Sequence, residues 1–179
     1  VLTAVGMMRP GKKRDCYAIL AQALERIGDA KWNLVLVGDG PARPEIETLF
    51  SFVPRDRLHF TGAVTRPEVL ACLSQSDVFV WPGHREPIGM VYLEAGALGV
   101  PVAALASMGV PLVVRDGETG ILAPENDIGA LAAAIATLVN EPARRAELGE
   151  NAKRNVHNRH DIAVASRVLS QEIQRIVGR

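Results

Sequence analysis

The sequence predicts a Rossmann-like, doubly wound α/β domain, in which helices cover both faces of a parallel sheet. Three observations favour this fold class. Short apolar runs rich in Val, Leu and Ile recur along the 179 residues, segments with apolar residues at helical spacing separate them, and glycine-bearing turns close most of the runs. Such an alternation, without an internal repeat or a low-complexity segment, is typical of βαβ units.

Charge and cysteine content exclude several classes of protein. The chain has 20 Lys and Arg residues and 20 Asp and Glu residues, and its longest basic run is residues 12–14, which argues against nucleic acid as a partner. Cys16 and Cys72 lie far apart, which indicates neither a disulfide framework nor a CxxC metal site. We therefore expect a reducing, cytoplasmic setting.

The chain opens on an apolar strand pattern at Val1, without an initiator Met or a charged lead-in. We therefore expect no signal peptide, and a sequence that is part of a longer protein. Residues 95–114 carry no charge and are long enough to span a membrane. Glycine and proline interrupt them, so the end of a helix followed by a buried strand explains this stretch better.

The first predicted unit is a strand at residues 1–5, a turn that begins at Gly6, and a helix at residues 15–27. The turn is strongly basic and includes Arg9 and Lys12. A basic, glycine-bearing turn at the carboxyl end of a strand suits a diphosphate, because Lys or Arg neutralises the charge of a leaving group. A solvated basic loop is the alternative interpretation of both side chains.

Residues 33–37 form the second predicted strand, which ends in a Gly-Asp-Gly-Pro loop that begins at Gly38. A dinucleotide fingerprint requires a third glycine where the chain has Arg43, so NAD or FAD binding is not supported. The loop either lines a ligand crevice or is only a tight turn before a helix at residues 43–50. A third strand at residues 58–60 leads into another helix.

The most informative stretch follows the predicted buried strand at residues 76–80. Pro87 is predicted in the first turn of a helix, so Glu86 lies at the mouth of that helix. The unpaired N–H groups there favour an anion such as a phosphate, and Gly89 lets a ligand approach the backbone closely. Glu94 comes eight residues after Glu86, about two helical turns, so both carboxylates can face the crevice beyond the strand ends.

The last part of the chain completes the predicted fold. A strand is expected at residues 100–104, and an Asp-Gly pair at Asp116 indicates a hairpin. Three helices follow, at residues 128–138, 142–156 and 161–176.

The string from Glu86 to Val102 resembles the signature of the retaining nucleotide-sugar glycosyltransferases with the GT-B fold, of the group 1 or family 4 type. The family form is roughly E-x-F-G-x-x-x-x-E-A-x-A-x-G-x-P-V. This chain departs from it by Ile88 in place of the aromatic residue and Gly96 in place of the usual Met or Gln.

The first basic turn resembles the family's G-R-L-x-x-x-K-G-x-D. Counted from Gly6, Lys12 falls on the family's Lys, whereas Met7 replaces the Arg and Lys13 replaces the second Gly. Arg9 is the candidate replacement for the missing Arg, because it lies on the same loop.

The resemblance implies that residues 1–179 form a single C-terminal, donor-binding domain, whose N-terminal, acceptor-binding partner domain is absent. It implies retaining transfer of a glycosyl unit from a nucleoside diphosphate sugar to an acceptor hydroxyl. Glu86 would contact the donor sugar and assist charge development at the anomeric centre, and Glu94 would bind the ribose hydroxyls. A glycosidase acid/base pair is the less favoured alternative, because it needs carboxylates on opposite sides of the scissile bond.

The resemblance also implies a set of donor-binding positions. The loops supply backbone contacts to the base and the diphosphate, Val64 being the candidate neighbour of the base. The full set is Gly6, Arg9, Lys12, Gly38, Val64, Ile88, Gly89, Met90, Val91 and Glu94. Neither a metal nor another cofactor is expected, and His157 and His160 have no third ligand in view.

The resemblance further implies that this chain alone is inactive, and it is compatible with peripheral membrane association of the full-length protein. A non-catalytic nucleotide-binding or interaction domain with the same fold is the second hypothesis, favoured by Met7. A nucleotide-sugar epimerase of the same fold is a third, disfavoured by the two glutamates. The sugar, the base and the acceptor are not encoded in these motifs.

Overall fold

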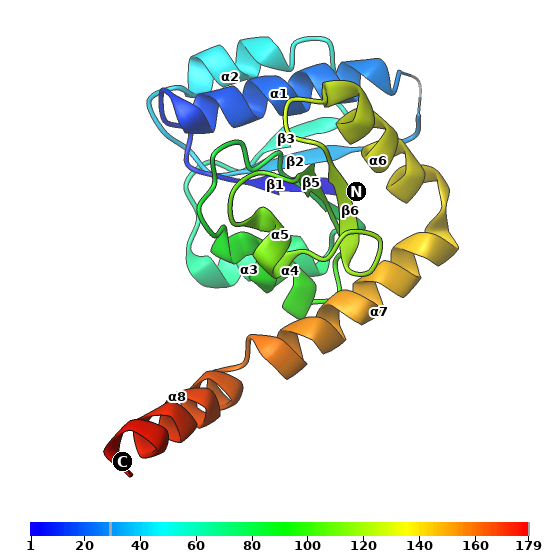
Figure 1. The fold of residues 1–179 in the computed structure, drawn as a ribbon. Coiled ribbons are helices and arrows are strands. Elements are labelled where there is room, and N and C mark those ends of the chain that lie inside the picture. The colour runs from blue at the N-terminus through cyan, green and yellow to red at the C-terminus, as the bar shows by residue number, and fades with distance from the viewer. Residues whose placement is uncertain (29, 179) are drawn as a thin grey trace.

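A six-stranded, all-parallel sheet forms the centre of the computed structural model, which describes residues 1–28 and 30–178 (Figure 1). The strand order is β3-β2-β1-β4-β5-β6. The strands are β1 (Leu2–Val5), β2 (Leu34–Val37), β3 (Leu58–Phe60), β4 (Val78–Val80), β5 (Val102–Leu105) and β6 (Gly120–Ala123). The order reverses between β1 and β4, which is the switch point of a doubly wound fold. The predicted fold class is therefore confirmed.

The central strands β1, β2, β4 and β5 are buried on both faces, which explains their sequences. Every residue of β4 and β5 is buried, and Leu2, Leu36 and Phe79 lie in the core. Strands covered on both faces are continuous apolar runs rather than alternating ones, as is typical of parallel sheets.

Two layers of helices enclose this sheet. Helices α1, α2 and α6 cover one face, and α3, α4 and α7 cover the other (Figure 1). The helices are α1 (Lys12–Arg26), α2 (Arg43–Leu49), α3 (Arg66–Ser74), α4 (Met90–Ala97), α5 (Val110–Val113), α6 (Ile128–Asn140), α7 (Pro142–Arg159) and α8 (Ile162–Val177). The three helices predicted after residue 126 are confirmed as α6, α7 and α8.

The prediction of a hairpin at Asp116 is wrong. Residues 110–113 form the short helix α5, in which Val110 and Val113 are buried. Strand β6 pairs in parallel with β5. The Asp-Gly pair does form a turn, in which Gly117 N–H donates to the Gly120 carbonyl at 2.9 Å. That turn leads into β6 and does not join two antiparallel strands.

Helix α8 extends away from the rest of the domain (Figure 1). None of its residues is buried, although its sequence is amphipathic. Its exposed large apolar side chains are Ile162, Val168, Leu169, Ile173, Ile176 and Val177. Among the described residues, no helix combines the length and the apolar character that a bilayer crossing requires.

Candidate functional site

The loops at the carboxyl edge of the sheet enclose a pocket of about 380 Å³ beside the switch point. Open α/β sheets bind ligands in this position. The lining residues come from β1, α1, β2, α3, α4 and the loops between them: Val5, Gly6, Met7, Lys13, Val37, Gly38, Asp39, Ala63, Val64, Val69 and Val91. Of the residues predicted from the sequence, Gly6, Gly38, Val64 and Val91 line this pocket.

Backbone packing between two glycines shapes one side of the pocket. Gly6 N–H donates to the Val37 carbonyl at 3.0 Å, which extends the pairing of β1 and β2 into their loops. Gly38 has φ 131°, and a Cβ there would lie 2.2 Å from the Gly6 carbonyl oxygen. Any larger residue at position 38 would push the two loops apart, so a side chain is excluded and the backbone remains accessible.

An ion pair joins α1 to the loop after β4. Lys13 Nζ lies 2.6 Å from Glu86 Oε2, and the two side chains are 32% and 18% exposed. Lys13 Nζ also lies 5.3 Å from the centroid of the Trp81 ring, a cation–π contact. Trp81 is buried and packs edge-on against Tyr17, with ring centroids 5.0 Å apart. These contacts fix the position of the Lys13 ammonium group at the edge of the pocket.

The structure places Lys13, and not Lys12, in the pocket. Lys12 and Arg9 are exposed and do not line it, so the proposed replacement of the family Arg by Arg9 finds no support in the geometry. Helix α1 begins at Lys12, and its buried residues include Cys16 and Tyr17. Lys13 lies three residues before Cys16 and four before Tyr17, so it shares the helix face of both buried residues.

The loop between β4 and α4 is longer than predicted. Helix α4 begins at Met90, and Gly89 is its N-cap with φ 69°. The placement of Pro87 in the first helical turn is therefore wrong, because Pro87 lies in the loop before the N-cap. Ile88 and Met90 are exposed beside this helix start. Glu86 is thus a loop residue, held by its pairing with Lys13.

The ring of Tyr92 explains why this loop contains glycines. A Cβ on Gly83 would lie 2.2 Å from the Tyr92 hydroxyl oxygen, and a Cβ on Gly89 would lie 2.5 Å from the ring. The buried Tyr92 hydroxyl donates to the Trp81 carbonyl at 3.1 Å. Burial raises the pKa of Tyr92, which keeps the hydroxyl protonated as a donor. The loop therefore wraps around one aromatic side chain.

The second carboxylate of the motif also has a cationic partner. Glu94 Oε1 lies 3.1 Å from Arg66 Nη2, and Glu94 is 17% exposed whereas Arg66 is 76% exposed. Arg66 is the first residue of α3 and lies within the capping box formed by Thr65 and Glu68. Because Val64 precedes that box, Glu94 and Val64 lie on neighbouring elements at one rim of the crevice.

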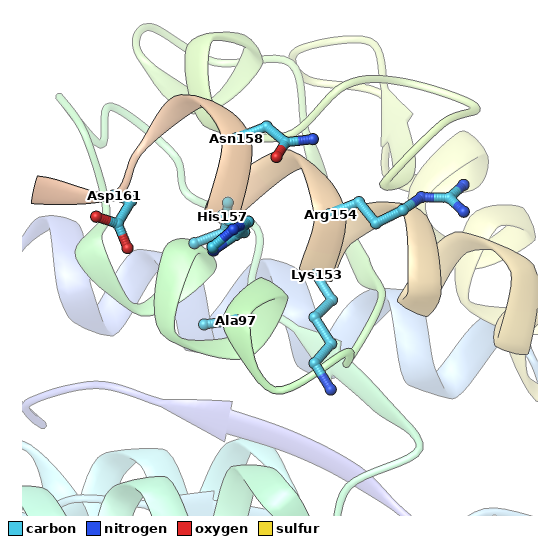
Figure 2. Close-up of a pocket in the computed structure, with 7 residues that line it drawn as sticks. Ala97, Lys153, Arg154, His157, Asn158 and Asp161 are labelled. Carbon is cyan, nitrogen blue, oxygen red and sulfur yellow. The ribbon is translucent and has the colours of Figure 1, made fainter. Parts of the chain in front are cut away.

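A larger hollow, of about 560 Å³, lies elsewhere on the domain. Figure 2 shows its labelled lining residues, Ala97, Lys153, Arg154, His157, Asn158 and Asp161. Ala97 is the last residue of α4, about 10 Å along the helix from the end that carries Gly89. The lining side chains of α7 are all at least partly exposed. This hollow shares no lining residue with the crevice at the switch point.

The described residues offer no evident cage for a metal ion. Within residues 1–28 and 30–178, no group of three or more His, Cys, Asp or Glu side chains is arranged to hold one. A reaction that proceeds without a metal remains a prediction.

The fold is thus an all-parallel, Rossmann-like α/β domain with an ion pair and a helix start beside its switch point. The family model described as "Glycosyl transferases group 1" matches residues 5–155. The chain therefore belongs to the group 1 glycosyl transferase family.

Named relatives agree with this assignment. The chain is 32% identical over 153 residues to alpha-D-kanosaminyltransferase of Streptomyces kanamyceticus, a match that covers 85% of the chain and 39% of the relative. It is 35% identical over 178 residues to D-inositol 3-phosphate glycosyltransferase of Thermomonospora curvata, covering 94% and 41%. The chain thus spans less than half the length of these relatives.

Solved structures share the fold. Sucrose-phosphate synthase from Thermosynechococcus elongatus superimposes with a TM-score of 0.80 at 29% identity, covering 99% of this chain and 46% of that one. HepE of Anabaena, solved in complex with UDP-glucose, gives a TM-score of 0.81 at 22% identity, covering 97% and 48%.

Cys16 lies beneath the loop that carries Glu86. Its buried Sγ donates to the His84 carbonyl at 3.8 Å. Burial raises the pKa of this thiol from 9.0 to about 11. The loop thus rests on a thiol that stays protonated where an exposed thiol ionises.

This raised pKa predicts a pH-dependent stability. Between pH 9 and about 11 the unfolded chain loses a proton that folded Cys16 keeps, so the free energy of unfolding falls as the pH rises. The expected slope from this group is at most about 1.4 kcal/mol per pH unit. Urea denaturation at several pH values measures it, and Cys16→Ala should have a shallower slope from pH 9 to 10. An equal slope in both proteins would contradict the assignment.

Proposed function

We propose that this chain is the donor-binding, C-terminal domain of a retaining GT-B glycosyltransferase, and that it binds a nucleoside diphosphate sugar in the crevice at the switch point. The observation that carries the proposal is the contact of Lys13 with Glu86 beside the start of α4. This contact joins a phosphate-binding type of side chain to the first glutamate of the family motif. Family membership and the Rossmann-like fold support it.

The diphosphate would be bound by charge and by backbone N–H groups. The backbone N–H groups of Gly89, Met90 and Val91 lie at the start of α4, where the helix dipole favours an anion. Lys13 carries three N–H donors, so it can bind a phosphate oxygen and keep Glu86 as a partner. That arrangement would hold the Glu86 carboxylate, which would contact the sugar, next to the leaving diphosphate. Lys13 would offset the negative charge of that diphosphate.

The nucleoside would occupy the apolar part of the pocket. Val64, Val69 and Val91 line it and can pack against the flat face of a base. Glu94 lies at the rim and would accept hydrogen bonds from the ribose hydroxyls in place of its contact with Arg66. Readout of the base through the backbone of Val64 is compatible with uracil, guanine or adenine.

A specific observation favours a second candidate, a non-catalytic nucleotide-binding domain. Met7 is 49% exposed and lines the pocket where the family motif has an Arg. Among the pocket-lining residues, Lys13 is the one Lys or Arg. One cation would bind a diphosphate less tightly than two. Glycosyl transfer by the longer protein decides between the two candidates.

The whole enzyme would need an acceptor domain. The chain spans less than half the length of its relatives, and the apolar side chains of α8 are exposed. We infer that α8 packs against the partner domain, and that the reaction takes place in the cleft between the two domains. The setting would be cytoplasmic, with peripheral membrane association of the longer protein, and no metal would take part.

The isolated chain is expected to be inactive in glycosyl transfer, because the acceptor would be bound by the partner domain. Hydrolysis and transfer assays with UDP-glucose, GDP-mannose and ADP-glucose on the 179-residue chain measure this. Turnover well above that of a Glu86→Ala control would show that the partner domain is not required.

Calorimetric titration with UDP, GDP and ADP, without added metal, tests the donor site. Lys13→Ala should weaken binding of the preferred nucleotide about 10- to 100-fold, because a hydrogen bond to a charged group is lost. Lys12→Ala is the matched control, with an expected change of about twofold or less, since its ammonium group is solvated. Equal losses in both variants would place the phosphates away from Lys13.

The two glutamates are expected to act on different parts of the donor. Glu94→Ala should weaken nucleoside diphosphate binding about tenfold, because the ribose loses a charged acceptor. Glu86→Ala should leave that affinity nearly unchanged and lower turnover in the two-domain protein. Unchanged nucleotide affinity in Glu94→Ala would refute the ribose assignment.

A further inference from the structure

Backbone strain gathers beside the Glu86 loop. Among the described residues, three non-glycine residues have positive φ: Arg85 (53°), Met108 (45°) and Asn126 (68°). They lie on the loops that follow β4, β5 and β6, which are adjacent strands of the sheet. Such conformations persist where surrounding contacts hold them, and they often mark functional sites.

One hydrogen-bonded chain connects these three loops. The backbone N–H of Arg85 donates to Ser107 Oγ at 3.0 Å, and Ser107 Oγ donates to Glu125 Oε1 at 2.8 Å. Ser107 is fully buried. Because the hydroxyl proton points to the carboxylate, an oxygen lone pair is left to accept from Arg85. Each of the three strained residues therefore either takes part in these hydrogen bonds or directly neighbours a residue that does.

The same loop after β5 also holds Glu86 itself. Gly109 N–H donates to the Glu86 carbonyl at 3.3 Å. A Cβ on Gly109 would lie 1.7 Å from the Pro87 carbonyl oxygen, so the two backbones are in direct contact. Glu86 is thus fixed on the preceding residue by Ser107 and on its own carbonyl by Gly109, while its side chain meets Lys13.

We propose that Ser107 and Glu125 are positioning residues for Glu86. Glu125 orients the Ser107 hydroxyl, and the hydroxyl accepts a hydrogen bond from the Arg85 N–H. The strained Arg85 backbone then sets the direction in which the Glu86 side chain projects from the loop. Neither Ser107 nor Glu125 lines the pocket. Their role in sugar binding rests on the proposed donor site, whereas their role in holding the loop does not.

Amide hydrogen exchange, followed by NMR at Arg85 in the 179-residue chain, tests the holding role. Ser107→Ala and Glu125→Ala should each speed exchange of the Arg85 amide about tenfold, because a hydrogen bond or its orienting partner is lost. Glu125→Gln should stay within about twofold of the unchanged chain, since its amide oxygen still accepts from the hydroxyl. Unchanged exchange in Ser107→Ala would overturn the proposal.

Thr3→Val is the matched control for loss of a buried hydroxyl. Thr3 Oγ1 lies 2.5 Å from Ser76 Oγ, beside the start of β4 rather than its end. This variant should leave Arg85 exchange unaltered. Equal acceleration in Thr3→Val would show a general loss of stability instead of a local hold, and would overturn the proposal.

The effect on the sugar is read from paired affinities. UDP, GDP and ADP are titrated beside UDP-glucose, GDP-mannose and ADP-glucose. Ser107→Ala should keep the affinity for the preferred nucleoside diphosphate within about twofold. It should change the ratio between the affinities for the sugar nucleotide and for the nucleoside diphosphate in the same direction as Glu86→Ala does. An equal loss for both ligands would overturn the positioning of Glu86. Absence of binding in the unsubstituted chain would refute the donor site, and Arg85 exchange would still decide the holding role.

Discussion

The ion pair between Lys13 and Glu86 is the interaction on which the site depends. It joins the first helix of one half of the fold to the loop that opens the other half. The strand order makes this possible, because β1 and β4 are neighbours although 73 residues separate the two partners. The aromatic support from Trp81 restricts the ammonium group to this place. A positive charge is thus held at the edge of the pocket by contacts within the protein.

Close backbone packing is the second constraint. Gly38 lets the loops after β1 and β2 touch, and Gly83 and Gly89 let the Glu86 loop wrap around Tyr92. The helix start that follows presents free N–H groups at a defined position. The strain at Arg85 adds a local restraint, held by the neighbouring loop.

Much of this arrangement could be predicted from the sequence, and the remainder depends on contacts that leave no local signal. The alternation of apolar runs predicted the sheet, and the glutamate motif predicted the family. The family string matches Lys12 to its Lys, whereas the structure places Lys13 in the pocket, on the helix face that it shares with Tyr17. Pro87 suits the first turn of a helix and so predicts an earlier start for α4, whereas this helix begins at Met90. No periodicity or motif could have linked Ser107 to Arg85, 22 residues away.

Two hollows of the domain are candidate ligand sites. The larger one, around His157, offers exposed polar side chains, whereas the crevice at the switch point offers a held cation, a helix start and two carboxylates. The most direct test is to map amide chemical-shift changes while UDP, GDP or ADP is added to the chain. If the crevice at the switch point binds the nucleotide, the largest changes occur at Gly38, Val64 and Val91. Changes confined to α7 around His157 would contradict binding in this crevice.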